Sequence, residues 1–329
     1  MKRRMTTRLG AIFAAMALSV PAALASDYPD RPITLVVPYS AGGPLDLTAR
    51  IVGDHMSKTL KQPVVVENIT GGGGGIATAR VARAAPNGYM LLIQQPALAA
   101  NVTLMPTPGL DIEKALTGIA IANESPMLIL ASKKINTPDM KAAVAWMKKN
   151  DNNIRFSHAG VGSLSHLCAT MFANAVGVSA TMIPYRGGTP AIADTMAGHA
   201  DLYCSSAQLA IPQIQGDTLT GLAVTADNRA PSVKAVPTTA EAGFDSVKAT
   251  FWQAFFAPAE TPKPVLDKLN EAIRLALADP NVQAQFEKAG MTATPVALQT
   301  PEATNKLLSS EIKKWGDVIR KSGMQAAPQ

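Results

Sequence analysis

Two stretches of this chain share one order of features: an apolar run, a turn of small residues, and a helix-like pattern. The first reads VVPYSAGGPLDLTAR, from Val36 to Arg50, and the second reads IRFSHAGVGSLSHL, from Ile154 to Leu167. In each, a strand ends at a turn that opens directly into a helix. Turns of this kind lie at the carboxyl edge of α/β sheets and present free N–H groups to an anion. The two turns therefore predict an α/β protein with an anion site.

Strand-like and helix-like segments alternate through much of the chain. Short apolar runs, such as ITLVV, QPVVVEN and MLLIQQ, are separated by segments whose apolar residues recur every three or four positions. One predicted helix, from about Leu47 to Leu60, would bury Leu47, Ile51 and Met56. The last predicted helix would bury Trp315. This alternation indicates mainly parallel sheets flanked by helices.

The N-terminus has the three parts of a secretory signal peptide. A basic start, MKRRMTTR, precedes the apolar run LGAIFAAMALSV, and the small-residue pattern ALA ends at Ala25. The apolar run is too short to span a bilayer as a helix. Residues 1–25 are therefore predicted to be a signal peptide, so the chain is expected to be exported.

The charge of the chain depends strongly on this segment. The whole sequence has a formal net charge of +6, with 30 basic and 24 acidic residues. Removal of residues 1–25 takes away four basic residues and no acidic ones, which leaves 26 against 24. A charge this close to zero gives no reason to expect nucleic-acid binding, which usually leaves a strong basic footprint. The remaining length favours two domains.

The cysteines and histidines form no recognisable metal site. Cys168 and Cys204 are expected to be two small buried residues, although a disulfide is chemically possible in an exported chain. The four histidines show no ligand spacing with cysteines or carboxylates. We therefore expect neither a metal nor a cofactor.

Two enzyme-like patterns are weak. Gly72, Gly74 and Ala77 fit a dinucleotide-binding loop, but no acidic residue follows at the distance that ribose recognition requires. Ser163 and His166 suggest an exported serine hydrolase, but the sequence around Ser163 lacks the second glycine of a nucleophile elbow. Ser163 is better interpreted as a helix N-cap. No catalytic residue is assigned, and the hydrolase stays an alternative.

Several ordered motifs resemble the Bug family, the TctC-type periplasmic substrate-binding proteins of tripartite tricarboxylate transporters. The resemblance covers essentially all of the chain after the signal peptide. It is carried by YPDRPITLVVPYSAGGPLDLTAR, QPVVVENITGGGGGIATARVARAAPNGYMLL, GVGSLSHL, IPYRGGTPAIADTMAGHADL, LAVTADNRAPSVKAVPTTAEAGF and FFAPAETPKPVLDKLNEAIRLALADP.

The resemblance implies a two-lobed "Venus flytrap" of the periplasmic-binding-protein fold, type II-like. Lobe 1 would comprise residues 26–125 plus 250–329, and lobe 2 residues 126–249. It also implies a periplasmic receptor, expected to be monomeric, that binds a small organic carboxylate between its lobes. Its partners would be the membrane permease subunits of such a transporter.

By match to the family motifs, both turns and two further segments are expected to line the ligand site. The expected ligand-binding residues are Tyr39, Ser40, Ala41, Gly42, Gly43, Pro44, Leu45, Asp46, Gly160, Val161, Gly162, Ser163, His166, Tyr185, Arg186, Ser205, Phe251 and Trp252. Asp46 is expected to act differently from the other residues, because its carboxylate would repel a carboxylate ligand. Asp46 is therefore expected to orient its own loop and not to contact the ligand. His166 is expected to donate to the bound anion.

Departures from the family pattern bear on the ligand. Relatives often have Ser or Thr at Pro44 and Asp at Ser205, and loss of that Asp makes an amino-acid ligand less favourable. Leu45, Phe251 and Trp252 would sandwich a flat apolar body. An aromatic dicarboxylate such as terephthalate is therefore the first candidate ligand, aliphatic di- or tricarboxylates come next, and an aromatic monocarboxylate is third.

Overall fold

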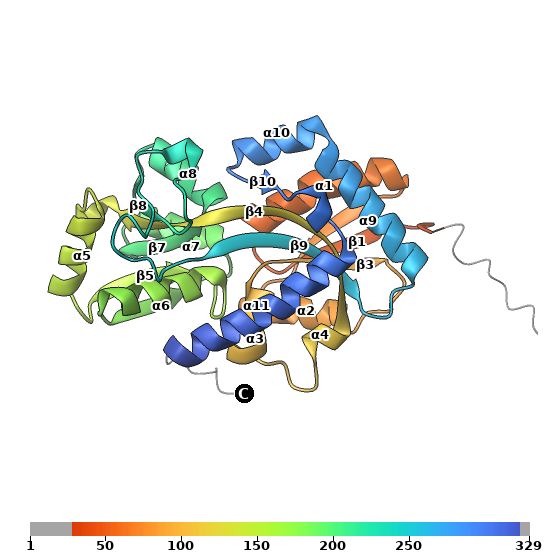
Figure 1. The fold of residues 1–329 in the computed structure, drawn as a ribbon, viewed down its shortest axis with the longest axis horizontal. Helices are drawn as coiled ribbons and strands as arrows, with labels where there is room; N and C mark the ends of the chain where they lie inside the picture. The colour runs from red at the N-terminus through yellow and green to blue at the C-terminus, as the bar shows by residue number, and fades with distance from the viewer. Residues whose placement is uncertain (1–27, 323–329) are drawn as a thin grey trace, which may run out of the picture.

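A mixed sheet runs through the whole molecule in the computed structural model, which describes residues 28–322 (Figure 1). The predicted signal peptide lies outside the described residues. The strand order is β2-β1-β3-β9-β4-β7-β5-β6, with β10 and β8 also paired to β4. The strands are β1 Ile33–Val37, β2 Val64–Asn68, β3 Met90–Gln94, β4 Leu116–Ser132, β5 Ile154–His158, β6 Ala180–Pro184, β7 Leu202–Ser206, β8 Leu219–Val224, β9 Thr250–Pro258 and β10 Thr292–Ala293.

The sheet has two parallel parts that are joined by antiparallel strands. In the first part, β1 pairs in parallel with β2 and β3. In the second, β5 pairs in parallel with β6 and β7. The long strands β4 and β9 run antiparallel to each other across the middle of the molecule (Figure 1). This arrangement confirms the predicted α/β class flanked by helices, with the parallel strands forming two parts of one mixed sheet.

Strand β4 is long, and Pro126 lies inside it. Up to Pro126, which pairs with Thr250, the strand is bonded to β9; from Met127 onward it is bonded to β7 and β8. Proline cannot donate a ladder hydrogen bond. Here the missing N–H falls where the strand changes partners, so the strand continues through it.

Helices surround both parts of the sheet (Figure 1). The helices are α1 Pro44–Leu60, α2 Gly75–Ala82, α3 Ala97–Leu104, α4 Ile112–Ala115, α5 Met140–Lys149, α6 Leu164–Val176, α7 Gly188–Met196, α8 Ala207–Gln215, α9 Lys263–Ala278, α10 Pro280–Lys288 and α11 Pro301–Ser322. Short 3₁₀ turns lie at η1 Gly72–Gly74, η2 Lys133–Ile135, η3 Pro231–Val233 and η4 Val296–Leu298. Between residues 28 and 322, no helix is both long and apolar enough to cross a membrane.

The buried face of α1 agrees with the predicted one at Met56 but not at Leu47. Leu45, Ala49, Val52 and Met56 are buried, whereas Leu47 is 36% exposed. The helix begins at Pro44, so Leu45 starts the inward stripe, and the small Ala49 continues it at the next turn. For α11, the prediction of a buried Trp315 is confirmed.

Cys168 and Cys204 form a disulfide that ties α6 to β7, with their Cα atoms 6.0 Å apart. Both side chains are fully buried, as expected, but they are not the unpaired thiols that the sequence favoured. Their pairing depends on α6 packing over β7, which the linear spacing of the two residues does not reveal.

Candidate functional site

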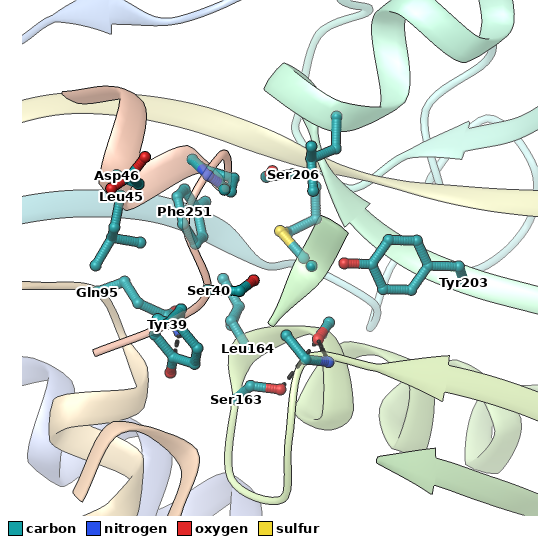
Figure 2. A pocket seen from close by; sticks show the side chains of 17 residues that line it. Tyr39, Ser40, Leu45, Asp46, Gln95, Ser163, Leu164, Tyr203, Ser206 and Phe251 are labelled. Atoms are coloured by element: carbon teal, nitrogen blue, oxygen red, sulfur yellow. Dashed lines mark hydrogen bonds between the residues drawn. The ribbon is translucent and has the colours of Figure 1, made fainter. Parts of the chain in front are cut away.

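A narrow cavity lies where the two halves of the molecule meet, and side chains from both halves surround it (Figure 2). Its volume of about 40 Å³ holds only a few water molecules. The first turn contributes Tyr39, Ser40, Gly43, Pro44, Leu45 and Asp46, and the second contributes Ala159, Ser163, Leu164 and Ser165. The structure thus brings the two turns predicted from the sequence to one place.

The first turn presents the N-terminus of α1 to the cavity. Gly43 is the N-cap residue and no side chain caps the helix there; Pro44 occupies the first turn of the helix. The first N–H groups of a helix have no intrahelical acceptor, and the aligned peptide dipoles add a partial positive charge. This end of α1 is therefore suited to an anion.

Asp46 does not offer its carboxylate as a free charge. Its two oxygens accept hydrogen bonds from Arg50 at 2.9 Å, from Asn68 at 3.0 Å and from the Gly42 N–H at 2.9 Å. Burial alone would raise the pKa of Asp46, but these hydrogen bonds hold it below its ordinary value. The geometry agrees with the expectation that Asp46 orients its own loop.

The second turn is shaped by two stacked histidines. The rings of His158 and His166 lie 4.5 Å apart between centroids. The Nδ1 atom of His158 accepts from the Gly160 N–H at 3.2 Å, and that of His166 accepts from the Gly162 N–H at 3.3 Å. Burial lowers the pKa of both imidazoles, to about 4 for His158. Both rings therefore act as neutral acceptors that support the turn.

Ser163 caps α6 as the sequence predicted. Its Oγ accepts from the His166 backbone N–H at 3.3 Å and lies 3.0 Å from Ser165 Oγ. The His166 imidazole, which would have to activate a serine nucleophile, is directed to Gly162 instead. This geometry does not form the nucleophile–base pair that a serine hydrolase requires.

Two more helix N-termini reach the same cavity. Gly188 begins α7 after the N-cap Gly187, and Ser206 is the N-cap of α8; neither helix end has a side-chain cap. Both Gly188 and Ser206 line the cavity. Four helices, α1, α6, α7 and α8, therefore direct their N-termini at one small space. Among the described residues that line it, Asp46 is the only charged one.

Three residues that line the cavity each have a buried side-chain polar atom without a hydrogen-bond partner within the protein. These atoms are Ser40 Oγ, Ser206 Oγ and Gln95 Oε1. Buried polar atoms of folded proteins are normally paired, so unpaired ones beside a cavity point to a ligand or ordered water. Gln95 and Ser206 are themselves 3% and 4% exposed.

The remaining wall is apolar. It is made by Leu45, Met127, Leu164, Leu209 and Phe251, with Tyr203 beside them. A ligand with a short apolar body between polar ends would match this combination of surfaces.

Comparison with known proteins agrees with this architecture. Residues 48–324 match the family model described as the tripartite tricarboxylate transporter family receptor, TctC. The chain belongs to this family. Its fold is that of the periplasmic binding protein BugD, with a TM-score of 0.88 and 35% identity over 91% of this chain and 100% of that one.

Two further structures of similar proteins contain dicarboxylates. MatC of Rhodopseudomonas palustris, solved with bound malate, has a TM-score of 0.86 and 33% identity, covering 89% of this chain and 100% of that one. A second R. palustris protein, solved with adipate, has a TM-score of 0.86 and 26% identity, covering 92% of this chain and 100% of that one.

In this TctC-family receptor, two residues expected at the ligand site face elsewhere. The indole of Trp252 donates to Glu311 at 3.1 Å, away from the cavity that its neighbour Phe251 lines. Successive residues of a strand point to opposite faces, so both rings could not form one wall. Ser205 hydrogen-bonds to the carbonyl of Ser206, and it is Ser206 that lines the cavity.

Other expected residues lie around the cavity and not on it. Ala41 and Gly42 are exposed at the tip of the first turn. Gly160, Val161, Tyr185 and Arg186 line a neighbouring open cleft that also touches Tyr39 and the glycine run. His166 lines a separate surface hollow and not this cavity; its Nδ1 accepts from the Gly162 N–H, which leaves Nε2 as the donor of the ring.

The two halves of the receptor touch through glycines. A Cβ atom on Gly73 would lie 2.1 Å from the Val161 carbonyl oxygen, and one on Gly162 would lie 2.0 Å from Asn101 Oδ1. Gly73 belongs to the run that resembles a dinucleotide loop. Its role in the structure is this close approach to the opposite turn.

Sequence reasoning missed about half of the lining. The missed residues are Gln95, Met127, Ala159, Leu164, Ser165, Gly188, Tyr203, Ser206 and Leu209. Gly188 and Ser206 carry the signal that revealed the first two turns, since each follows a strand and begins a helix at small residues. Gln95 and Met127 have no such local signal.

Proposed function

We propose that this protein is a periplasmic receptor that binds a small organic dicarboxylate between its two halves and delivers it to the membrane subunits of a tripartite tricarboxylate-type transporter. The observation that carries the proposal is the convergence of four helix N-termini on a cavity whose only charged lining residue, among those described, is Asp46. Each N-terminus contributes about half a positive charge together with unpaired N–H donors.

Such a site offsets the cost of burying a carboxylate without a cationic side chain. An ionised carboxylate is expensive to remove from water unless its oxygens are hydrogen-bonded. Backbone N–H groups and the hydroxyls of Ser40 and Ser206 supply those bonds. The malate and adipate found in two family members support a dicarboxylate, because both molecules carry two carboxyl groups.

The body of the ligand meets Leu45 and Phe251. An aromatic dicarboxylate such as terephthalate stays a candidate, because these side chains give an apolar wall. With Trp252 directed to Glu311, however, the wall has one aromatic ring of the two expected, which weakens the preference for a flat ring over an aliphatic chain.

The proposed lobes are residues 26–125 plus 250–329 and residues 126–249, with β4 and β9 as the two connections between them. The cavity is too small to admit a dicarboxylate from solvent without movement. Opening about these two strands would let the ligand enter, and closing would bring the four N-termini onto it. The predicted signal peptide supports export to the periplasm, where the receptor would act as a monomer.

Calorimetric titration of the mature chain with mono-, di- and tricarboxylates and amino acids tests the proposal. We expect dicarboxylates to bind, and a ligand at 100 times its Kd to raise the free energy of unfolding by about 2.7 kcal/mol. Binding of amino acids or neutral solutes, with no response to any carboxylate, would show the proposal to be wrong.

A matched pair of variants tests the contribution of charge. Ser206→Asp places a carboxylate at the N-cap of α8, whereas Ser206→Asn adds a side chain of similar size without charge. Both residues are good N-caps, so the fold should tolerate either. We expect Ser206→Asp to lose carboxylate binding much more than Ser206→Asn. Turnover of a model ester, abolished by Ser163→Ala, would instead support the hydrolase.

A further inference from the structure

Gln95 occupies a special place at the cavity. It follows β3, which ends at Gln94, and precedes α3, which begins at Ala97. Its backbone N–H is bonded to Gln94 Oε1 at 2.9 Å, and its side chain is held by Tyr39. These contacts fix a buried amide side chain in the wall of the site (Figure 2).

The hydrogen bonds of Tyr39 determine which way this amide faces. The Tyr39 hydroxyl donates to the Gly73 carbonyl oxygen at 2.8 Å, and a carbonyl can only accept. Burial raises the pKa of Tyr39, so the hydroxyl keeps its proton. The phenol oxygen must therefore accept at its remaining position, and the Gln95 Nε2 group, 2.7 Å away, is the donor. The amide oxygen then lies on the other side of the group.

Gln95 Oε1 is thus an acceptor without a donor. It is buried and makes no hydrogen bond within the protein. Apart from the Asp46 carboxylate, which is already paired with Arg50, Asn68 and Gly42, the polar groups of the lining are N–H groups and hydroxyls, which can donate to a carboxylate. An ionised carboxylate has no proton, so it cannot donate a hydrogen bond to Gln95 Oε1.

We infer that the ligand carries a hydroxyl group next to its clamped carboxylate, and that Gln95 Oε1 accepts the hydrogen bond from that hydroxyl. The inference rests on the proposed function and narrows its ligand class to hydroxycarboxylates. A site built to hydrogen-bond a hydroxyl rejects the analogue that lacks it, since its buried acceptor is then left unpaired.

Two matched pairs of acids test the inference by calorimetry: malate with succinate, and 2-hydroxyterephthalate with terephthalate. In each pair only the hydroxyl differs. We expect the unchanged protein to prefer the hydroxylated member of at least one pair by roughly tenfold. Gln95→Met keeps the length of the side chain and removes the acceptor, so this ratio should fall to near one.

Gln299→Met is the control, because Gln299 is also a buried amide but lies away from the cavity, where its Nε2 donates to the Thr294 carbonyl. It should leave the ratio unchanged even if stability falls. Equal binding of both members of each pair by the unchanged protein would overturn the inference while leaving the proposed function intact, and needs no variant to fold. Failure of all carboxylates to bind would overturn both. A ratio that survives Gln95→Met would also overturn the assignment to Gln95.

Discussion

Gly187→Ala should separate closure of the two halves from folding. Gly187 has φ of 161°, which is extended backbone that any residue adopts. A Cβ atom there would nevertheless lie 2.1 Å from Ser40 Oγ, 3.0 Å from Ser40 N and 3.1 Å from Ser40 Cβ. Ser40 belongs to the opposite half, and its N–H donates to the Arg186 carbonyl at 3.2 Å. The added methyl group therefore acts on the contact between the halves.

The size of the effect follows from these distances. Ser40 Oγ can rotate away, but the backbone nitrogen cannot, so reaching ordinary contact of about 3.5 Å requires the halves to separate by roughly 0.5 Å. Overpacking of this kind typically costs about 1–3 kcal/mol. If only the closed form bears this cost, the Kd for the carboxylate should rise by roughly 5- to 150-fold.

Isothermal titration and ligand-free thermal unfolding together check this prediction. Gly75→Ala is the control, because Gly75 is helical and a Cβ there meets nothing within 4 Å. We expect Gly187→Ala to lose affinity with little change in its ligand-free unfolding temperature, and Gly75→Ala to change neither. Normal affinity in Gly187→Ala would refute the idea that ligand binding needs this close contact.

Three further predictions concern charge, protonation and the disulfide. Arg50→Ala should weaken carboxylate binding by roughly tenfold, because it leaves the buried Asp46 carboxylate without its cation. Titration calorimetry measures this loss, with Arg50→Lys as the comparison variant that keeps a positive charge. Because burial lowers the pKa of His158 to about 4, the unfolded chain binds a proton between about pH 6.5 and 4 that the native state does not. The free energy of unfolding should therefore fall by roughly 3 kcal/mol as pH drops through this window. In His158→Asn, which keeps an acceptor at the Nδ1 position, urea unfolding at several pH values should show a free energy of unfolding that depends less on pH. An unchanged pH dependence would contradict the assignment to His158. Replacing both Cys168 and Cys204 by Ala should cost about 3–4 kcal/mol, seen in denaturant unfolding, with carboxylate affinity unchanged, because neither residue lines the cavity.

Local chemistry made much of the fold predictable. Apolar runs followed by small residues and a helical period located the turn before α1 and the turn before α6, and Ser163 was identified as an N-cap because a serine before an apolar helical run satisfies the first N–H groups. These features depend on residues close together in sequence. The α/β class follows from their alternation alone.

The sequence determined the local elements, and the tertiary structure decided which side chains meet. Trp252 and Phe251 are neighbours in sequence, yet the pleat of β9 sends one to Glu311 and the other to the cavity. Cys168 meets Cys204 because α6 packs on β7. Gln95 Oε1 is left as an unpaired acceptor because the amide Nε2 of Gln95 donates to the hydroxyl of Tyr39, which follows a different strand. Contacts of this kind join residues far apart in the chain, so no local pattern records them.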